Sequence, residues 1–153
     1  MSGAGTTGAP PALSAGELEA FLAREFPEAF NASSGLAVER VWRGGAQLRQ
    51  SCRTGFLRPG GTISGPTMMM LADVAMYVAV LSAVGPVPLA VTTSLNINFL
   101  RRPAAADLVA EAELMKLGRR LAVGQIAIRS AAAPAGDDLV AHATSSYSIP
   151  QQS

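Results

Sequence analysis

The feature of this sequence that most restricts its fold is an apolar run, Met68 to Val84, that contains a single charged residue. Pro66 lies just before the run and suits the first turn of a helix, because the N–H that proline lacks would have no partner there. Gly85 and Pro86 follow the run and are typical of a helix end. A helix that is apolar on nearly every side has to be enclosed by protein. The sequence therefore predicts a buried central helix from about Gly65 to Gly85, with a curved sheet around it.

The same run argues against a membrane span, and the rest of the chain fits a cytoplasmic protein. Met68 to Val84 is shorter than the roughly 20 residues that a span needs, and it carries Asp73. Residues 1–13 are small, uncharged and rich in Gly and Pro, without the basic start or apolar stretch of a signal peptide, so we expect a disordered leader. The single cysteine, Cys52, excludes an internal disulfide, and a cytoplasmic location is the default expectation.

Composition limits the classes of partner. Of the 153 residues, 49% are hydrophobic, which is enough for one domain with its own core, expected at residues 14–150. Twelve Lys and Arg against 11 Asp and Glu give a net charge of +1, so overall charge favours neither nucleic acid nor an anionic membrane. One histidine, His142, and one cysteine do not supply the spacing of a zinc site.

Shorter patterns predict the elements around the central helix. A helix is expected from Ser14 to Phe26, where apolar residues recur at helical spacing behind a capping serine and Pro27 ends the pattern. A hairpin turning at Arg43-Gly44-Gly45 and an antiparallel meander of four further strands complete an α+β chain with one core. The expected strands are residues 36–42, 46–53, 89–100, 108–117, 121–130 and 139–149. Alternation in 89–100 places Val91, Thr93, Leu95, Ile97 and Phe99 on one face, and Thr92, Ser94, Asn96 and Asn98 on the other.

Asp73 is the residue that packing does not explain. A lone carboxylate in a buried helix destabilises the fold by several kcal/mol unless it is paired, hydrogen-bonded or protonated. Asp73 either lies at the edge of the helix and accepts hydrogen bonds from a neighbouring strand or loop, or it serves as a general base or nucleophile.

A second candidate lies eight residues earlier, where Ser64 and Gly65 open the helix. Free backbone amides and the positive end of the helix dipole form a donor site for an oxyanion there, although an ordinary capped helix start has the same appearance. Eight residues of helix separate Gly65 from Asp73 by roughly 12 Å, so the two cannot serve one carbonyl within one chain. If both act together, two chains contribute, as in a twofold dimer with two equivalent sites.

These residues resemble the hotdog-fold acyl-CoA thioesterases, in particular the PaaI-like branch of the phenylacetate pathway. The resemblance covers roughly Leu57 to Ile149. It implies a hotdog fold, an antiparallel sheet wrapped around a long central helix, and a homodimer or a dimer of dimers. The segments that carry it are Gly61-Thr62-Ile63-Ser64-Gly65-Pro66, Leu71-Ala72-Asp73, Leu95-Asn96-Ile97-Asn98-Phe99-Leu100-Arg101-Arg102-Pro103 and Lys116-Leu-Gly-Arg-Arg-Leu-Ala.

The resemblance also implies roles for single residues in hydrolysing an acyl-CoA with neither metal nor redox cofactor. The Gly65 amide would bind the thioester carbonyl, and Asp73 of the opposite protomer would attack or activate water. Thr92 matches a Ser/Thr position that orients the water or the carboxylate. The sequence departs from the family at Ser64, where a histidine is usual, at Pro66, where a second glycine is usual, and at Arg58, where some members have asparagine.

Basic residues point to an anionic ligand. Residues 40–129 hold eleven of the twelve basic residues and four acids. Four arginines follow strand ends or sit in a turn and are candidates for the phosphates of coenzyme A, or else solvated residues that keep an apolar protein in solution: Arg101, Arg102, Arg119 and Arg120. Ser64 and Arg58 are further candidate substrate contacts.

Two other functions remain open. The first is a non-catalytic acyl-CoA sensor, which Ser64 in place of histidine favours. The second is a hotdog dehydratase or hydratase, which the position of His142 in the last strand disfavours. Neither the acyl group, nor the choice between dimer and tetramer, nor that between nucleophilic and general-base attack follows from the sequence.

Overall fold

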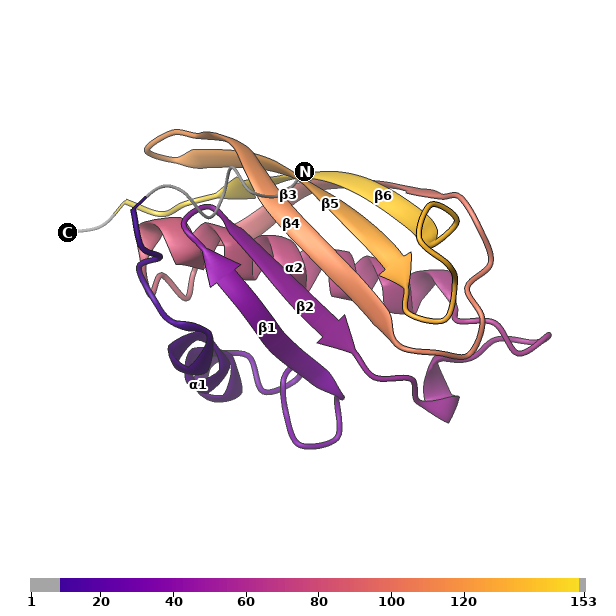
Figure 1. Ribbon diagram of the computed structural model, residues 1–153. Coiled ribbons are helices and arrows are strands. Elements are labelled where there is room, and N and C mark those ends of the chain that lie inside the picture. Colours follow the sequence, from indigo (N-terminus) through magenta and orange to yellow (C-terminus); the bar gives the residue numbers. More distant parts are fainter. Residues whose placement is uncertain (1–8, 152–153) are drawn as a thin grey trace.

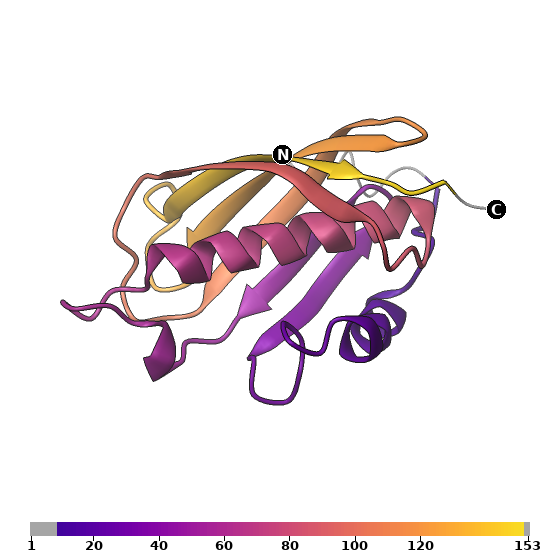
Figure 2. The same cartoon turned by 180° about the vertical axis from the view of Figure 1, so that it is seen from behind.

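The computed structural model describes residues 9–151 and shows a six-stranded antiparallel sheet with a long helix lying across one face (Figure 1 and Figure 2). The predicted α+β arrangement of a sheet around a central helix is confirmed. The strand order is β1-β2-β4-β5-β6-β3. The elements are α1 (Ala15–Glu25), β1 (Leu36–Trp42), β2 (Gly45–Gln50), the short 3₁₀ helix η2 (Thr54–Phe56), α2 (Gly65–Val84), β3 (Val91–Phe99), β4 (Leu108–Leu117), β5 (Leu121–Ser130) and β6 (Leu139–Ser148).

The central helix α2 has the predicted bounds. Ser64 is the N-cap and its hydroxyl accepts a hydrogen bond from Thr67 N–H. From Val74 to Ala83 every side chain is buried, but Met69 and Met70 in the first half are 41% and 48% exposed. The first half of the helix is therefore less fully covered than the second. The sheet covers one side of α2 (Figure 2). The exposed side chains of Met69 and Met70 form an apolar stripe that the protomer leaves uncovered.

The expectation that the apolar segment is too short for a membrane span is wrong, because the helix that contains it, α2, is 20 residues long. By length and composition alone, such a helix could cross a bilayer. However, 72% of its most apolar window is buried against the rest of the chain, as in the core helix of a globular domain. A single helix of this kind is weak support for a membrane span, and its burial inside the domain disfavours one.

Strand β3 lies at the edge of the sheet and pairs with β6. The predicted meander is therefore wrong for this strand: only β4, β5 and β6 follow one another, and β4 pairs with β2. The chain passes from β3 to the far side of this meander before it enters β4. The outer edge of β3 has no strand beside it among residues 9–151.

A bulge at Thr93 changes the faces of β3 from those that strict alternation predicts. Thr92 pairs with Tyr147, but the next pair is Ser94 with Ser146, so one extra residue lies in β3. As a consequence, Thr92 shares the helix-facing side of the sheet with Leu95, Ile97 and Phe99, while Val91 faces away. The predicted assignment of Thr92 and Val91 is wrong for this reason.

The N-terminal segment is attached to the core. Ser14 and Glu17 form a capping box that starts α1, and Leu18, Phe21 and Leu22 are buried as the pattern predicts. Residues 1–8 of the expected leader lie outside the described residues. At its end, Ala12 N–H donates to Ser82 O at 2.7 Å and Leu13 packs against the core.

The first hairpin is shorter than predicted at its end. Strand β2 ends at Gln50. Ser51 N–H still donates to Gly35 O opposite it, but Cys52 N–H donates to the Asp107 carboxylate and not to a strand.

The turn of this hairpin carries the tightest contact for a glycine. A Cβ on Gly45 would lie 2.1 Å from Trp42 Nε1, and the indole is only 3% exposed. Gly45→Ala should destabilise the protein by about 3 kcal/mol, because the buried indole has to leave its position. Thermal unfolding measures this. Gly16→Ala in α1 is the control, since a Cβ there meets nothing within 4 Å and should leave the melting temperature unchanged or slightly higher. Equal melting temperatures for the two variants would contradict the prediction.

Candidate active site

Asp73 lies in the middle of α2, on the side that faces β3 and β6. It is half-buried, whereas Ala72 and Val74 beside it are buried. Its Oδ1 atom accepts hydrogen bonds from Thr92 Oγ1 at 2.5 Å and from Tyr147 Oη at 3.2 Å. These two hydrogen bonds offset part of the free-energy cost of placing a carboxylate in an apolar helix. For Oδ2, the structure records no hydrogen bond from residues 9–151.

A cavity of about 210 Å³ opens next to this carboxylate. Phe26 at the end of α1, Thr92 and Tyr147 are among its walls. Burial, and to a lesser degree the charge of Asp73, hold the pKa of Tyr147 well above its usual range. Tyr147 therefore stays protonated and remains a hydrogen-bond donor across the physiological pH range.

Gly65 opens α2 beside a second cavity of about 210 Å³. Ser64 O and its hydroxyl bind the N–H groups of Met68 and Thr67, while no partner for Gly65 N–H is recorded in the described part of the chain. A Cβ on Gly65 would lie 3.3 Å from the ring of Phe99 at the end of β3. The backbone of Gly65 is thus open to a ligand on one side and close to an aromatic ring on another.

Three of the predicted arginines gather near Gly65. Arg58, Arg101 and Arg102 line the cavity that Gly65 lines. All three are exposed, and Arg101 lies 3.5 Å from the exposed Asp137 carboxylate. An ion pair this exposed contributes little to stability, so these cations remain available to an anionic ligand.

The other two predicted arginines lie toward the opposite end of the sheet. Arg119 and Arg120 form the turn between β4 and β5, and Arg120 Nη2 donates to Gln151 Oε1 at 2.8 Å. Arg120 is two residues from Ala122 on β5. Ala122 pairs with Tyr147 on β6, and Tyr147 contacts Asp73. Within one protomer, this pair of arginines belongs to the Asp73 end.

The candidate residues therefore form two groups that one protomer does not bring together. Gly65 and Asp73 are eight residues apart on one straight helix, or roughly 12 Å. Strand β3 runs between the same two groups, and Thr92 and Phe99 lie about 24 Å apart along it. The structure thus preserves the separation that the sequence predicts.

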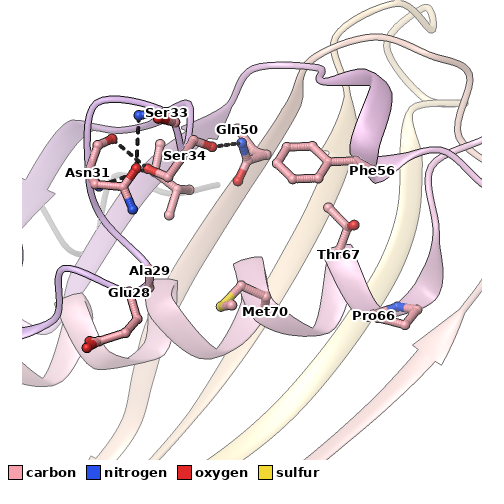
Figure 3. A pocket seen from close by; sticks show the side chains of 11 residues that line it. Glu28, Ala29, Asn31, Ser33, Ser34, Gln50, Phe56, Pro66, Thr67 and Met70 are labelled. Carbon is pink, nitrogen blue, oxygen red and sulfur yellow. Dashed lines mark hydrogen bonds between the residues drawn. The ribbon is translucent and has the colours of Figure 1, made fainter.

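A third cavity, of about 430 Å³, does not contain Asp73 and is larger than the two described above. It lies between the first turns of α2 and the loop after α1 (Figure 3). Phe56, Pro66 and Met70 give it apolar walls, and the polar groups of the loop, Asn31 and Ser34, are bonded to each other and to nearby backbone. Pro66 directly follows Gly65, so this cavity begins one residue from the candidate oxyanion donor.

Ser64 and His142 have surroundings that differ from those of the other candidates. The Ser64 hydroxyl caps α2 and lies 2.9 Å from Thr67 Oγ1, which explains a serine here without a substrate. His142 lies on the sheet face away from α2, where its Nε2 is 3.2 Å from Gln125 Oε1. It is not close to Asp73.

Two residues of the site, Tyr147 and Phe99, were not predicted from the sequence. Tyr147 is buried and touches Asp73, and Phe99 covers Gly65. No spacing rule finds Tyr147, because 74 residues separate it from Asp73. The only signal was an aromatic residue in a run of small polar ones, Thr144-Ser-Ser-Tyr-Ser.

Comparison with known proteins extends these observations. A family model described as the thioesterase superfamily matches residues 60–132. A candidate thioesterase from a Silicibacter species is 38% identical over 94% of this chain and 96% of that one, with a TM-score of 0.81. The phenylacetic acid degradation protein PaaI from Thermus thermophilus, solved in a mutant form, is 27% identical over 81% and 99%, with a TM-score of 0.69.

Fold likeness extends to more distant proteins. A hypothetical thioesterase from Streptococcus pneumoniae, solved with coenzyme A, is 19% identical over 86% of this chain and 98% of that one, with a TM-score of 0.72. Among curated proteins, the search found no match. Together with the sheet and central helix, these likenesses confirm the predicted hotdog fold.

Proposed function

Because this chain belongs to the thioesterase superfamily, in its PaaI-like hotdog form, we propose that it hydrolyses acyl-CoA thioesters to a carboxylic acid and coenzyme A. The observation that carries the proposal is the set of contacts around the Asp73 carboxylate. This carboxylate has one oxygen bound by two hydroxyls and lies at a cavity, on a helix whose first amide has no recorded partner among residues 9–151. A base and an oxyanion donor are the two groups that thioester hydrolysis requires.

A homodimer is part of the proposal, because only a second copy brings the two groups together. The outer edge of β3 offers unpaired backbone groups, with Val91 57% and Phe99 49% exposed. Met69 and Met70 form an open apolar stripe on the adjoining helix. Antiparallel pairing of two β3 edges would place Gly65 of one chain near the Asp73 end of the other and would cover apolar surface on both. Pairing of two such dimers into a tetramer remains a further expectation.

The proposed reaction uses water and no cofactor. The thioester carbonyl accepts a hydrogen bond from Gly65 N–H of one chain. The carboxylate of Asp73 of the other chain either takes a proton from water as the water attacks the carbonyl carbon, or attacks that carbon to form an anhydride that water opens. In both routes the C–S bond breaks and one water is consumed. Its oxygen enters the acid product or, through the anhydride, the Asp73 carboxylate, and one of its protons goes to the departing coenzyme A thiol.

The cavities on the two sides of Gly65 suggest how the substrate lies. The arginines on one side, Arg58, Arg101 and Arg102, suit the negative charges of coenzyme A. Arg119 and Arg120 of the second chain would join them from the Asp73 end. The apolar cavity on the other side, with Met70 in its wall, would take the acyl group.

A panel of straight-chain acyl-CoAs tests both the activity and this direction of binding. We expect thiol release from wild-type protein, with kcat/KM rising with chain length. Met70→Trp should lower kcat/KM for the longer acyl groups about tenfold, the effect of keeping two methylenes, at ~0.8 kcal/mol each, out of apolar space. It should leave acetyl-CoA unaffected.

Met115→Trp is the matched control, because Met115 is exposed in the β4–β5 hairpin and lines none of the cavities described above. An equal loss for every chain length would contradict the direction of binding. Absence of thiol release from the whole panel would contradict the activity itself.

The second candidate function is a non-catalytic acyl-CoA sensor. The observation that favours it is the engagement of the Ser64 hydroxyl in the helix cap, which leaves no histidine-like group at this position. Acyl-CoA that raises the melting temperature and remains intact for hours would support the sensor over the enzyme.

A further inference from the structure

We propose that Tyr147 is a positioning residue that, together with Thr92, fixes Oδ1 of Asp73 so that Oδ2 is the oxygen that reacts. The inference rests on the proposed function and adds a residue and an atom to it. It concerns a side chain on β6, at the Asp73 end of the site.

The hydroxyls of Thr92 and Tyr147, which contact the Asp73 carboxylate, belong to residues that lie opposite each other on neighbouring strands. Thr92 on β3 and Tyr147 on β6 are directly paired, and the bulge at Thr93 places Thr92 on the same α2-facing side of the sheet as Tyr147. Their oxygens lie 2.5 Å and 3.2 Å from Oδ1 of Asp73. Two donors on one oxygen fix the rotation of the carboxylate about its last bond, so Oδ2 is held in one direction.

Tyr147 is itself held rigidly, as a positioning group has to be. Its ring is 3% exposed and stacks on Tyr77, with ring centroids 6.0 Å apart and planes inclined by 23°. Tyr77 lies one helical turn after Asp73, and its hydroxyl donates to Pro88 O at 2.9 Å. Strand β6 lies between β5 and β3, so its backbone is bonded on both sides.

The contact with the Asp73 side chain also distinguishes this role from a purely structural one. Tyr147 Oη lies 3.2 Å from the backbone oxygen of Asp73 as well as 3.2 Å from Oδ1. If only the backbone contact mattered, loss of the hydroxyl would lower stability and leave turnover unchanged. If the contact with Oδ1 matters, loss of the hydroxyl lowers turnover.

Tyr147→Phe tests the proposal in the full-length protein, with hydrolysis of the best acyl-CoA of the panel as the assay. We expect kcat to fall about tenfold, because a hydrogen bond to a charged group is lost, while KM stays within twofold. Ser145→Ala is the matched control: it removes another buried hydroxyl of β6, which donates to Ser94 O at 3.0 Å and lines none of the cavities described above. It should leave both constants unchanged.

Thermal unfolding of both variants gives the second measurement. A drop of the melting temperature in Tyr147→Phe with wild-type kcat would overturn the proposal, and so would equal losses of kcat in the two variants. If Tyr147→Phe does not fold, Tyr147→Met gives the same comparison, because it fills the space without a hydroxyl. Wild-type protein is measured beside these variants. An inactive wild type would overturn both the proposed function and the role of Tyr147. An active wild type with an unchanged kcat in Tyr147→Phe would overturn only the role of Tyr147.

Discussion

Asp73→Asn is expected to lower kcat for acyl-CoA hydrolysis by about 10³-fold or more. The amide has the shape of the carboxylate and its oxygen can still accept from Thr92 and Tyr147, so the fold should be retained. The amide, however, neither takes a proton from water nor attacks a carbonyl. A positioned general base accelerates a reaction by about 10²–10⁴-fold, and this acceleration is lost. Steady-state thiol release with the best substrate measures the loss.

Glu39→Gln is the control for Asp73→Asn. Glu39 is an exposed carboxylate on β1 that binds Gln47 and Arg49, so its replacement should leave kcat unchanged. Asp73→Ala should be at least as inactive as Asp73→Asn. Thiol release at the wild-type rate by both Asp73 variants would remove this residue from the mechanism.

Gly65→Pro is expected to lower kcat by about 10²–10³-fold, because it removes the N–H that binds the carbonyl in the transition state. Proline is tolerated at the first position of a helix, and Ser64 already has the extended conformation (φ −73°, ψ 154°) that a following proline requires. Gly65→Ala is the control. It adds the same Cβ near Phe99 but keeps the N–H, so it should retain much more activity than the proline variant. Equal activities of the two variants would show that the amide is not used.

Mixing the two inactive variants tests whether a site takes one group from each chain. In a dimer of Asp73→Asn with Gly65→Pro, one site carries both defects and the other carries neither. Random pairing makes half of the dimers mixed, so about a quarter of the sites should be intact and about a quarter of the wild-type rate should return. No gain of activity in co-refolded material would contradict a shared site.

Much of the fold follows from patterns along the chain. The start of α2 is set by Ser64 and Pro66, and its end by Gly85, which has φ +91°. Each of these is a local effect of backbone chemistry, and the bounds predicted from it agree with the structure. The separation of Gly65 from Asp73 needs only the rise of a helix.

The features of the fold and site that could not be predicted depend on which strands pair with each other. The pairing of β3 with β6 instead of β4 has no local signal, because every strand here alternates in the same way. The bulge at Thr93 moves Thr92 to the helix-facing side, although the sequence alternates without a break. Tyr147 reaches Asp73 only through this pairing. Its contact is therefore a property of the assembled sheet and not of any segment of sequence.

The extra residue in β3 also separates two tasks that one strand performs. Before the bulge, the strand supports an acidic group in its own protomer; after it, the strand faces Gly65 and the open edge. Because each half has its own register, a substitution after the bulge changes the side chains near Gly65 while Thr92 keeps its contact with Asp73.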